Sequence, residues 1–309
     1  MSNVFIRTII PIFLLMGAGL LSRKIKILKS GDERVLSAYV YYFALPALFL
    51  VTIAETGFTS EILTFMVAGM LPIFIVLAVY SSLYFLFRLP RNIFYLLTLC
   101  TIFGSLAFFG IPFITFAFPT EGERLATLSA AFIAIVSVTT SLLTLELYRL
   151  ETSTKRGGTK KLVMRLSKNP LIISILLGIF FSLTGLQIPT PISDSLHMLG
   201  ATTSVVAIFM LGVFLYGKKY TKMKKAFKLS LLRIVFLPTV SLLVSRLFGL
   251  IDVKGAVLVL MHGMPIAVSM IVLSERYNFY KETIASLILV SSLGAAIYLN
   301  LWLILLGYY

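Results

Sequence analysis

Two short motifs within apolar stretches are the strongest chemical signal in this chain. They read Gly110-Ile111-Pro112 and Gly263-Met264-Pro265. A proline inside a helix removes one backbone hydrogen bond and clashes with the carbonyl one turn earlier, and a nearby glycine loosens the helix further. Exposed half-helix ends persist in lipid only where protein or a water-filled cavity covers them, and their N-terminal ends favour anions. The motifs therefore predict interrupted helices that cross at a central site, although two ordinary proline kinks would give the same pattern.

A histidine and several neutral residues lie near these motifs or in neighbouring stretches. His262 directly precedes the second motif and is the only ionisable side chain that we place near the middle of an apolar stretch. It could carry a proton or pair with a carboxylate, or it could be a hydrogen-bonded structural residue. The predicted ligand-contacting residues are Ser105, Phe108, Phe109, Gly110, Pro112, Thr203, Ser204, His262, Gly263, Pro265, Ser269 and Tyr42, with Tyr41 and Thr202 as further candidates. Their hydroxyl groups could equally bond helix carbonyls.

Other kinds of chemistry are not indicated by the sequence. It contains no Gly-x4-Gly-Lys-Ser/Thr phosphate loop, no spaced metal ligands, and no nucleophile with a matching base. No pair of carboxylates lies in the middle of an apolar stretch, which argues against a sodium/proton antiporter that relies on titrating acids. We therefore expect a protein that is not an enzyme and that needs neither a cofactor nor a bound metal.

The elements that carry these residues are predicted to be membrane-spanning helices. Of the 309 residues, 59% are hydrophobic and only 13% are charged, against about 45–50% and about 25% in soluble domains. The apolar residues form blocks of about 20 residues, the length that a helix needs to cross a bilayer. We place ten such blocks near residues 4–21, 35–54, 62–87, 92–118, 125–148, 170–186, 192–217, 229–249, 255–274 and 283–306.

The charged residues lie mostly between the blocks and predict the orientation. Every second loop is basic: residues 23–34 hold five Lys or Arg, residues 149–168 hold seven, and residues 218–228 hold six. Basic loops of multi-pass proteins remain in the cytoplasm. We therefore expect a cell (inner) membrane protein with both termini extracytoplasmic, and we attribute the net charge of +15 to these loops and not to nucleic-acid binding.

The two halves of the chain share weak similarities in the same order. The matching positions are Pro11 and Gly17 with Pro170 and Gly178, Ala47-Leu48-Phe49 with Ala207-Ile208-Phe209, Pro72 with Pro238, and the two Gly-x-Pro motifs with each other. Five crossings per half is an odd number, so the halves must be inserted upside down relative to each other. The predicted organisation is a first five-helix repeat over residues 1–150, a cytoplasmic linker over 151–168, and an inverted five-helix repeat over 169–309.

The order of several short segments resembles the auxin efflux carrier family. These segments are Ile10-Pro11 with Gly17 and Gly19, Leu45-Pro46-Ala47-Leu48-Phe49, Gly110-Ile111-Pro112, Asn169-Pro170-Leu171-Ile172, and Met264-Pro265 followed by Ser274-Glu275-Arg276-Tyr277. The resemblance implies a scaffold domain and a transport domain, each built from both repeats, with broken helices four and nine crossing at the substrate site. It also implies a homodimer and substrate contacts from Ser105 and His262. Many members have an asparagine near the first break, where this chain reads Gly104-Ser105-Leu106-Ala107.

These observations favour a secondary transporter of small organic anions, such as auxin-like aromatic or dicarboxylic acids, in the lipid bilayer. An elevator-type alternating-access movement is the mechanism that the resemblance implies. One alternative is a sodium-coupled organic anion symporter of the bile-acid carrier type, which shares the ten-helix plan. Its sodium sites require several oxygen ligands at the crossover, where this chain has almost no Asn, Gln, Asp or Glu. A ligand-binding membrane sensor is the other alternative.

Overall fold

The chain is almost entirely helical in the part that the structure describes. The computed structural model describes residues 2–56, 59–152, 164, 167–168, 170–217 and 220–308. Within these residues there is no β-strand, and a single antiparallel bridge joins Gly104 to Ile266. Most of the predicted linker, residues 151–168, lies outside the described residues.

The helices follow the predicted apolar blocks closely. In the first half they are α1 (Ser2–Lys24), α2 (Glu33–Tyr39), η1 (Val40–Ala44), α3 (Leu45–Ala54), α4 (Ser60–Phe87), α5 (Arg91–Ile102), η2 (Leu106–Gly110), α6 (Ile111–Ala117) and α7 (Gly122–Thr152). In the second half they are α9 (Pro170–Thr184), α10 (Thr190–Leu215), α11 (Met223–Leu231), η3 (Leu232–Phe236), α12 (Leu237–Leu247), α13 (Val253–Gly263), α14 (Met270–Tyr277) and α15 (Lys281–Leu305).

By length and composition, six continuous helical stretches of the described residues are apolar enough to cross a membrane. They are Glu33–Ala54, Ser60–Phe87, Gly122–Arg149, Thr190–Leu215, Met223–Leu247 and Lys281–Leu305, with shorter apolar helices between them. Large apolar side chains also cover the outside: Leu247 is 85% exposed and Phe85 is 76% exposed. A protein of this kind is a multi-pass membrane protein, because lipid is the solvent that accepts such a surface.

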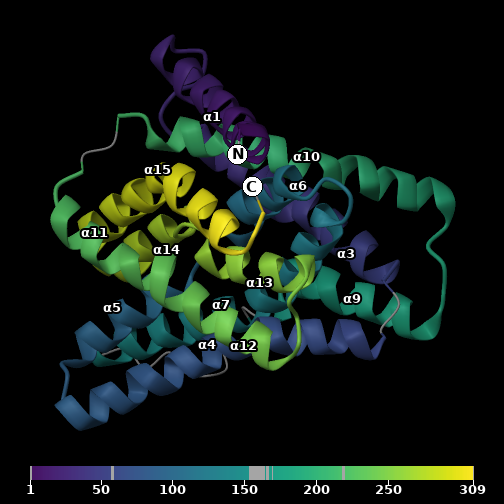
Figure 1. Ribbon diagram of the computed structural model, residues 1–309. Helices are drawn as coiled ribbons and strands as arrows, with labels where there is room; N and C mark the ends of the chain where they lie inside the picture. The colour runs from purple at the N-terminus through teal and green to yellow at the C-terminus, as the bar shows by residue number, and fades with distance from the viewer. Residues whose placement is uncertain are drawn as a thin grey trace.

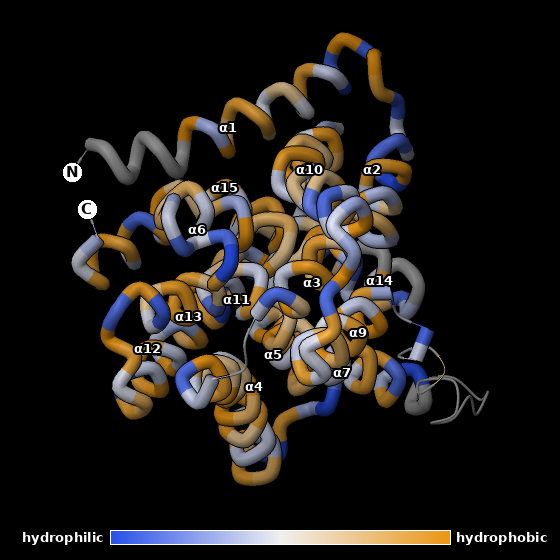
Figure 2. Tube along the Cα trace, turned by 90° about the vertical axis from the view of Figure 1, so that its right-hand side faces the viewer, coloured by the Kyte–Doolittle hydropathy of each residue, from blue (hydrophilic) through white to orange (hydrophobic). Residues whose placement is uncertain are grey.

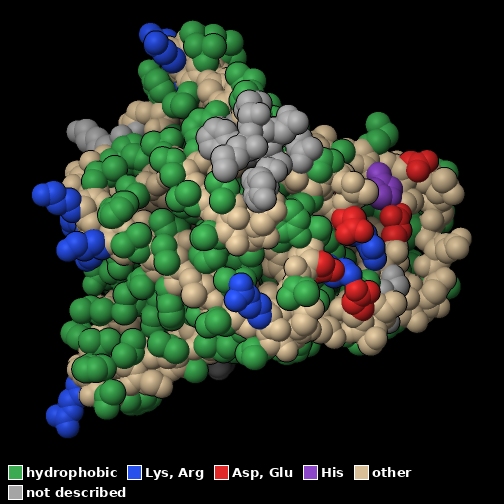
Figure 3. All heavy atoms as spheres, viewed as in Figure 1, with side chains coloured by type: hydrophobic (Ala, Val, Ile, Leu, Met, Phe, Trp, Pro, Cys, Tyr) green, Lys and Arg blue, Asp and Glu red, His purple; other side chains and the backbone are tan. Residues whose placement is uncertain are grey.

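Charged side chains are unevenly distributed over the face shown in Figure 3. Figure 3 shows Asp and Glu side chains gathered toward the right of the view, while several Lys and Arg side chains lie at the left-hand edge. Apolar side chains cover much of the surface between these two ends. The arrangement suits a protein whose ends lie in water and whose middle lies in hydrocarbon.

Three wide π-helical turns (η1, η2 and η3) each directly precede an X-Pro pair. Pro46, Pro112 and Pro238 occupy an early position of the α-helix that follows, α3, α6 and α12 respectively. A proline cannot donate its backbone nitrogen to the carbonyl one turn earlier, and a wider turn makes room for its ring. At η3 the carbonyl of Ile234, four residues before Pro238, accepts instead from Trp302 Nε1 at 2.8 Å. These prolines therefore modify continuous helical segments without ending them.

The helices form two groups, which we call the first and second bundles. In the first bundle, α1 packs along α10, α3 packs along α9, and α10 packs against α2, η1 and α3. In the second, α12 packs against α13 and α4, α11 and α14 pack against α15, η2 packs against α6, and α4, α5 and α6 pack against α7. Figure 1 shows α1 and α10 along the top and α4, α5 and α12 toward the bottom, and Figure 2 shows α12, α13 and α4 at the lower left, away from α10.

Glycines let helix backbones of the first bundle approach closely. A Cβ atom at Gly19 of α1 would lie 2.0 Å from the Phe209 carbonyl oxygen of α10, and one at Gly212 of α10 would lie 1.9 Å from the Met16 carbonyl oxygen. A Cβ atom at Gly178 of α9 would lie 3.0 Å from the Leu50 carbonyl oxygen of α3. Gly17, which we had matched with Gly178, has open space around it. Small residues at such crossings are typical of helices that pack within membranes.

Candidate functional site

Two helices of the second bundle are interrupted, and their non-helical segments cross. The segment Phe103–Ser105 follows α5, and the segment Met264–Ser269 joins α13 to α14. The backbone N–H of Ser105 donates to the Pro265 carbonyl at 2.7 Å, and the N–H of Ala267 donates to the Phe103 carbonyl at 3.1 Å. We call these two segments the crossover. Their mutual hydrogen bonds satisfy backbone groups that would otherwise be left without partners in an apolar environment.

The second interruption begins where the sequence predicts it, but the first does not. The helix that contains Pro112 runs from Leu106 to Ala117 through the wide turn η2, so the expected break at Gly110-Ile111-Pro112 is wrong. The chain instead leaves the helix seven residues before Gly110, at Phe103. Gly110 still contributes to the crossover, because a Cβ atom there would lie 2.8 Å from Met261 Sδ at the end of α13.

Arg233 lies against the crossover and is completely buried. Its Nε donates to the Met264 carbonyl at 2.8 Å, and its Nη1 donates to the carbonyls of Thr101 at 2.8 Å and Ile102 at 3.3 Å. Its Nη2 donates to the Met261 carbonyl at 3.4 Å. The last carbonyls of a helix have no partners within it and carry a partial negative charge. One guanidinium therefore satisfies the C-terminal ends of both α5 and α13.

The sequence interpretation missed this arginine. We named His262 as the only ionisable side chain near the middle of an apolar block, although Arg233 stands inside the predicted block 229–249. A lone arginine within such a block is itself a signal of a functional or structural site. Because it lies near the start of the block, it resembles a residue of the basic loop that precedes the block.

A cavity of about 300 Å³ lies beside the crossover, between the two bundles. The first bundle contributes residues of α2, η1, α3 and α9 to its wall, and the second contributes the crossover, η2, α7 and α14. Its wall is apolar or hydroxyl-bearing and includes Ser37, Tyr41, Phe49, Phe103, Gly104, Ser105, Phe108, Ala134, Ser137, Ala267 and Ser269. A volume of this size suits a small organic molecule.

The structure brings only part of the predicted site to this cavity. Ser105, Phe108 and Ser269 line it, as does the further candidate Tyr41. Tyr42 is 59% exposed on the outside of the helix. The rest of the predicted set, which does not line the cavity, is Phe109, Gly110, Pro112, Thr203, Ser204, His262, Gly263 and Pro265.

Several of these other residues pack within the helices or form part of the crossover backbone. Phe109 is buried and stacks on Phe113 with ring centroids 6.4 Å apart. Thr203 is buried within α10, and Ser204 beside it is half-buried. Pro265 contributes its carbonyl to the crossover pairing.

His262 is held by a backbone contact within the second bundle. It is completely buried, and its Nε2 lies 2.8 Å from the Gly69 carbonyl oxygen of α4. A carbonyl accepts only, so Nε2 must carry the proton and donate it. The contact ties α13 to α4 close to the place where α13 ends. Of the two roles that the sequence left open, this geometry matches the hydrogen-bonded structural residue.

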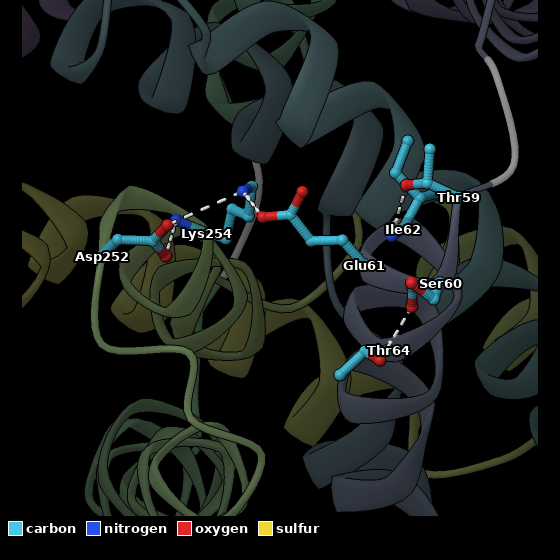
Figure 4. A network of polar contacts seen from close by, with 7 residues as sticks. All are labelled: Thr59, Ser60, Glu61, Ile62, Thr64, Asp252 and Lys254. Carbon is cyan, nitrogen blue, oxygen red and sulfur yellow. Dashed lines mark hydrogen bonds and ion pairs between the residues drawn. The ribbon is translucent and has the colours of Figure 1, made fainter.

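Two ion pairs near helix ends each join helices of one bundle. In the first bundle His197 Nε2 lies 2.9 Å from Glu55 Oε1, and in the second Lys254 pairs with Glu61. Figure 4 shows that Glu61 reaches toward Lys254 from the first turn of α4, which Thr59 caps by accepting from the Ile62 N–H at 3.3 Å. Hydrogen bonding to the Glu61 carboxylate is the main cause that raises the pKa of Lys254.

The chain matches known proteins over nearly its whole length. The family model described as "Membrane transport protein" matches residues 4–303. The uncharacterized transporter YfdV of Escherichia coli (strain K12) is 24% identical over 313 residues, covering 98% of each chain. The uncharacterized transporter MJ1031 of Methanocaldococcus jannaschii is 25% identical over 306 residues, covering 95% of this chain and 96% of its own. The chain therefore belongs to the membrane transport protein family, which is the auxin efflux carrier family that its sequence resembles.

Proposed function

We propose that this membrane transporter is a secondary carrier of small organic anions and that the cavity beside the crossover is its substrate site. The observation that carries the proposal is the position of the cavity, which lies between the two bundles and beside the interrupted helices. The segments that follow the two interruptions begin at Leu106 and Met270, next to residues of the cavity wall. Helix N-terminal ends favour a negative charge, so a carboxylate can be held there without a basic side chain in the wall.

The wall of the cavity favours one of the two acid classes. Three phenylalanines, Phe49, Phe103 and Phe108, lie in it together with only a few hydroxyl groups. An aromatic ring buries well against such a surface, whereas a second carboxylate would lose its hydration without gaining a charged partner. We therefore propose an aromatic monocarboxylic acid of the auxin type ahead of a dicarboxylic acid.

An elevator-type movement is the mechanism that we propose. The long-range polar contacts described above join residues of the same bundle, as in Glu55 with His197 and Glu61 with Lys254. The cavity wall between the bundles consists mainly of apolar side chains, which can slide past each other without breaking strong hydrogen bonds. In this proposal the first bundle is the scaffold, and the second carries the crossover and the substrate.

Two exchanged helix pairs support the proposed inverted repeat. The first helix of the chain packs on α10, the seventh predicted block, while α9, the sixth, packs on the second block. This exchange is what a twofold relation between the halves would give. Gly19 and Gly178, which make close approaches in the two pairs, are 159 residues apart, as are Pro11 and Pro170. The ten crossings, the extracytoplasmic termini, the inner membrane and a homodimer through the scaffold remain parts of the proposal.

Filling the cavity tests the site. Ala134 lines the cavity from α7, so Ala134→Leu should obstruct it, whereas Ala201→Leu adds the same side chain at an exposed position of α10. In proteoliposomes we expect uptake of radiolabelled indole-3-acetate by the wild type and by Ala201→Leu, and a loss of at least about tenfold in Ala134→Leu, corresponding to about 1.4 kcal/mol. Equal uptake by all three proteins would refute the site. Thermal stabilisation by the acid without any uptake would favour the sensor.

A further inference from the structure

The convergence of carbonyl oxygens around Arg233 is the feature of the crossover that the proposed function does not use. The C-terminal ends of α5 and α13 face each other there, and each end contributes two of the oxygens. A helix C-terminus carries the equivalent of about −0.5 elementary charge. Two facing ends therefore amount to about −1, which a single guanidinium balances.

A burial of this kind requires that balance. Removing a charged side chain from water costs several kcal/mol unless it is paired and hydrogen-bonded. Among the described residues, the ion pairs of the structure do not involve Arg233, so the helix ends are its counter-charge. Neighbouring residues are adapted to it: a Cβ atom at Gly104 would lie 1.6 Å from Nη2. The turn η3 that carries Arg233 is completed by Trp302, which donates to the Ile234 carbonyl.

Backbone carbonyls that converge in this way are the ligands with which membrane proteins also replace the hydration shell of an alkali cation. Here the five N–H groups of the guanidinium occupy that position, and a covalent tether prevents the charge from leaving. Gly104 also lines the cavity, so the guanidinium lies directly behind the cavity wall. The guanidinium therefore holds in place the backbone that forms this part of the cavity wall.

We propose that Arg233 is a tethered cation that takes the place of a bound metal ion at the crossover, joining the two half-helices and making the site independent of Na⁺. It is a positioning residue, because it acts through the crossover backbone. The independence of transport from Na⁺ rests on the proposed transport function. The role of Arg233 in joining the two half-helices does not. The stability of the purified protein therefore tests the inference separately from transport.

The experiment measures thermal unfolding of purified wild type, Arg233→Met, Arg233→Lys and Arg233→Ala. We expect the wild type to unfold at the same temperature in NaCl and in choline chloride of equal concentration. Arg233→Met keeps most of the side-chain length without the charge and should unfold at a clearly lower temperature. Arg233→Lys, which keeps the charge with fewer donors, should lie between the two. Arg233→Ala should be stabilised by about 10 mM methylguanidinium chloride, while the wild type should not, because only the variant has a vacant place for this cation.

Several outcomes would overturn the inference. An Arg233→Met protein as stable as the wild type would show that the charge is not needed. Equal failure of Arg233→Met and Arg233→Lys to fold would assign the residue a packing role independent of charge. A wild-type protein that Na⁺ stabilises over choline would mean that a metal site exists elsewhere in the crossover region. If folded Arg233→Lys protein can be purified and folded Arg233→Met protein cannot, the result supports the inference even when Arg233→Ala cannot be purified.

Discussion

The substitution Gly104→Ala should break the contact between Arg233 and the crossover. The new Cβ atom would lie 1.6 Å from Nη2, 2.3 Å from Cζ and 2.9 Å from Nε, while an ordinary contact is 3.4 Å or more. The guanidinium would have to retreat by more than 1.5 Å, which is too far to keep its hydrogen bonds to the Met264 and Thr101 carbonyls, both 2.8 Å long. Losing two hydrogen bonds from a charged donor costs about 3–6 kcal/mol.

The assay is thermal unfolding of the purified protein in mild detergent. Unfolding is monitored by the fluorescence of a thiol-reactive dye or by intrinsic tryptophan fluorescence. Gly17→Ala is the matched control, because nothing lies within 4 Å of a Cβ atom there and alanine favours a helix over glycine by about 0.5–1 kcal/mol. We expect the control to unfold at or slightly above the wild-type temperature and Gly104→Ala to unfold well below it. If the two variants unfold together, the close packing of the guanidinium on Gly104 is wrong.

Three further predictions follow from contacts in the two bundles. His262→Ala should lower the free energy of unfolding by about 1–3 kcal/mol, because the hydrogen bond to the Gly69 carbonyl is lost. Uptake per folded molecule should be retained. Selective loss of uptake at unchanged stability would instead assign His262 a role in substrate binding. Gly212→Ala places a Cβ atom 1.9 Å from a carbonyl oxygen of α1. We therefore expect size-exclusion chromatography to show much less folded protein than for the control Gly17→Ala. A normal yield would mean that α1 and α10 do not pack so closely. The pKa of Lys254 is raised above its ordinary value of 10.5 mainly by hydrogen bonding to Glu61, so the stabilisation is present below that pH and is lost as the pH rises through the higher folded-state pKa. Glu61→Gln should remove this part of the alkaline dependence of unfolding, and an unchanged pH profile would argue against the pair.

The sequence was sufficient for the helices because hydrocarbon imposes a simple rule. A helix that crosses it needs about 20 apolar residues, and every backbone group must be satisfied within the segment. The predicted blocks therefore coincide with single helices or with consecutive ones, as in 229–249, which corresponds to α11, η3 and α12. The ten crossings and the inverted repeat stay predictions. Among the residues that the structure describes, six helical stretches are long and apolar enough to cross a membrane.

The sequence was less informative about where the interruptions lie. A Gly-x-Pro motif announces a disturbed turn, but the disturbance at Pro112 is absorbed by the wide turn η2, whereas the same motif at Pro265 ends a helix. The difference lies in the hydrogen-bond partners, because the Pro265 carbonyl accepts from the Ser105 N–H across the crossover. Phe103 and Ser105 are not residue types that predict the end of a helix. Which segment leaves the helix depends on a pairing between residues about 160 positions apart.

Residue types alone thus determined a multi-pass membrane protein with candidate solute contacts near two breaks, because hydropathy and proline chemistry act locally. The tertiary structure decided which candidates share a cavity, bringing Tyr41, Ser105, Phe108 and Ser269 together and leaving Tyr42 outside. It also decided the role of Arg233, whose charge is tolerated only because two distant helix ends converge on it. Such compensation arises from long-range geometry, which a linear pattern of apolar and charged residues does not encode.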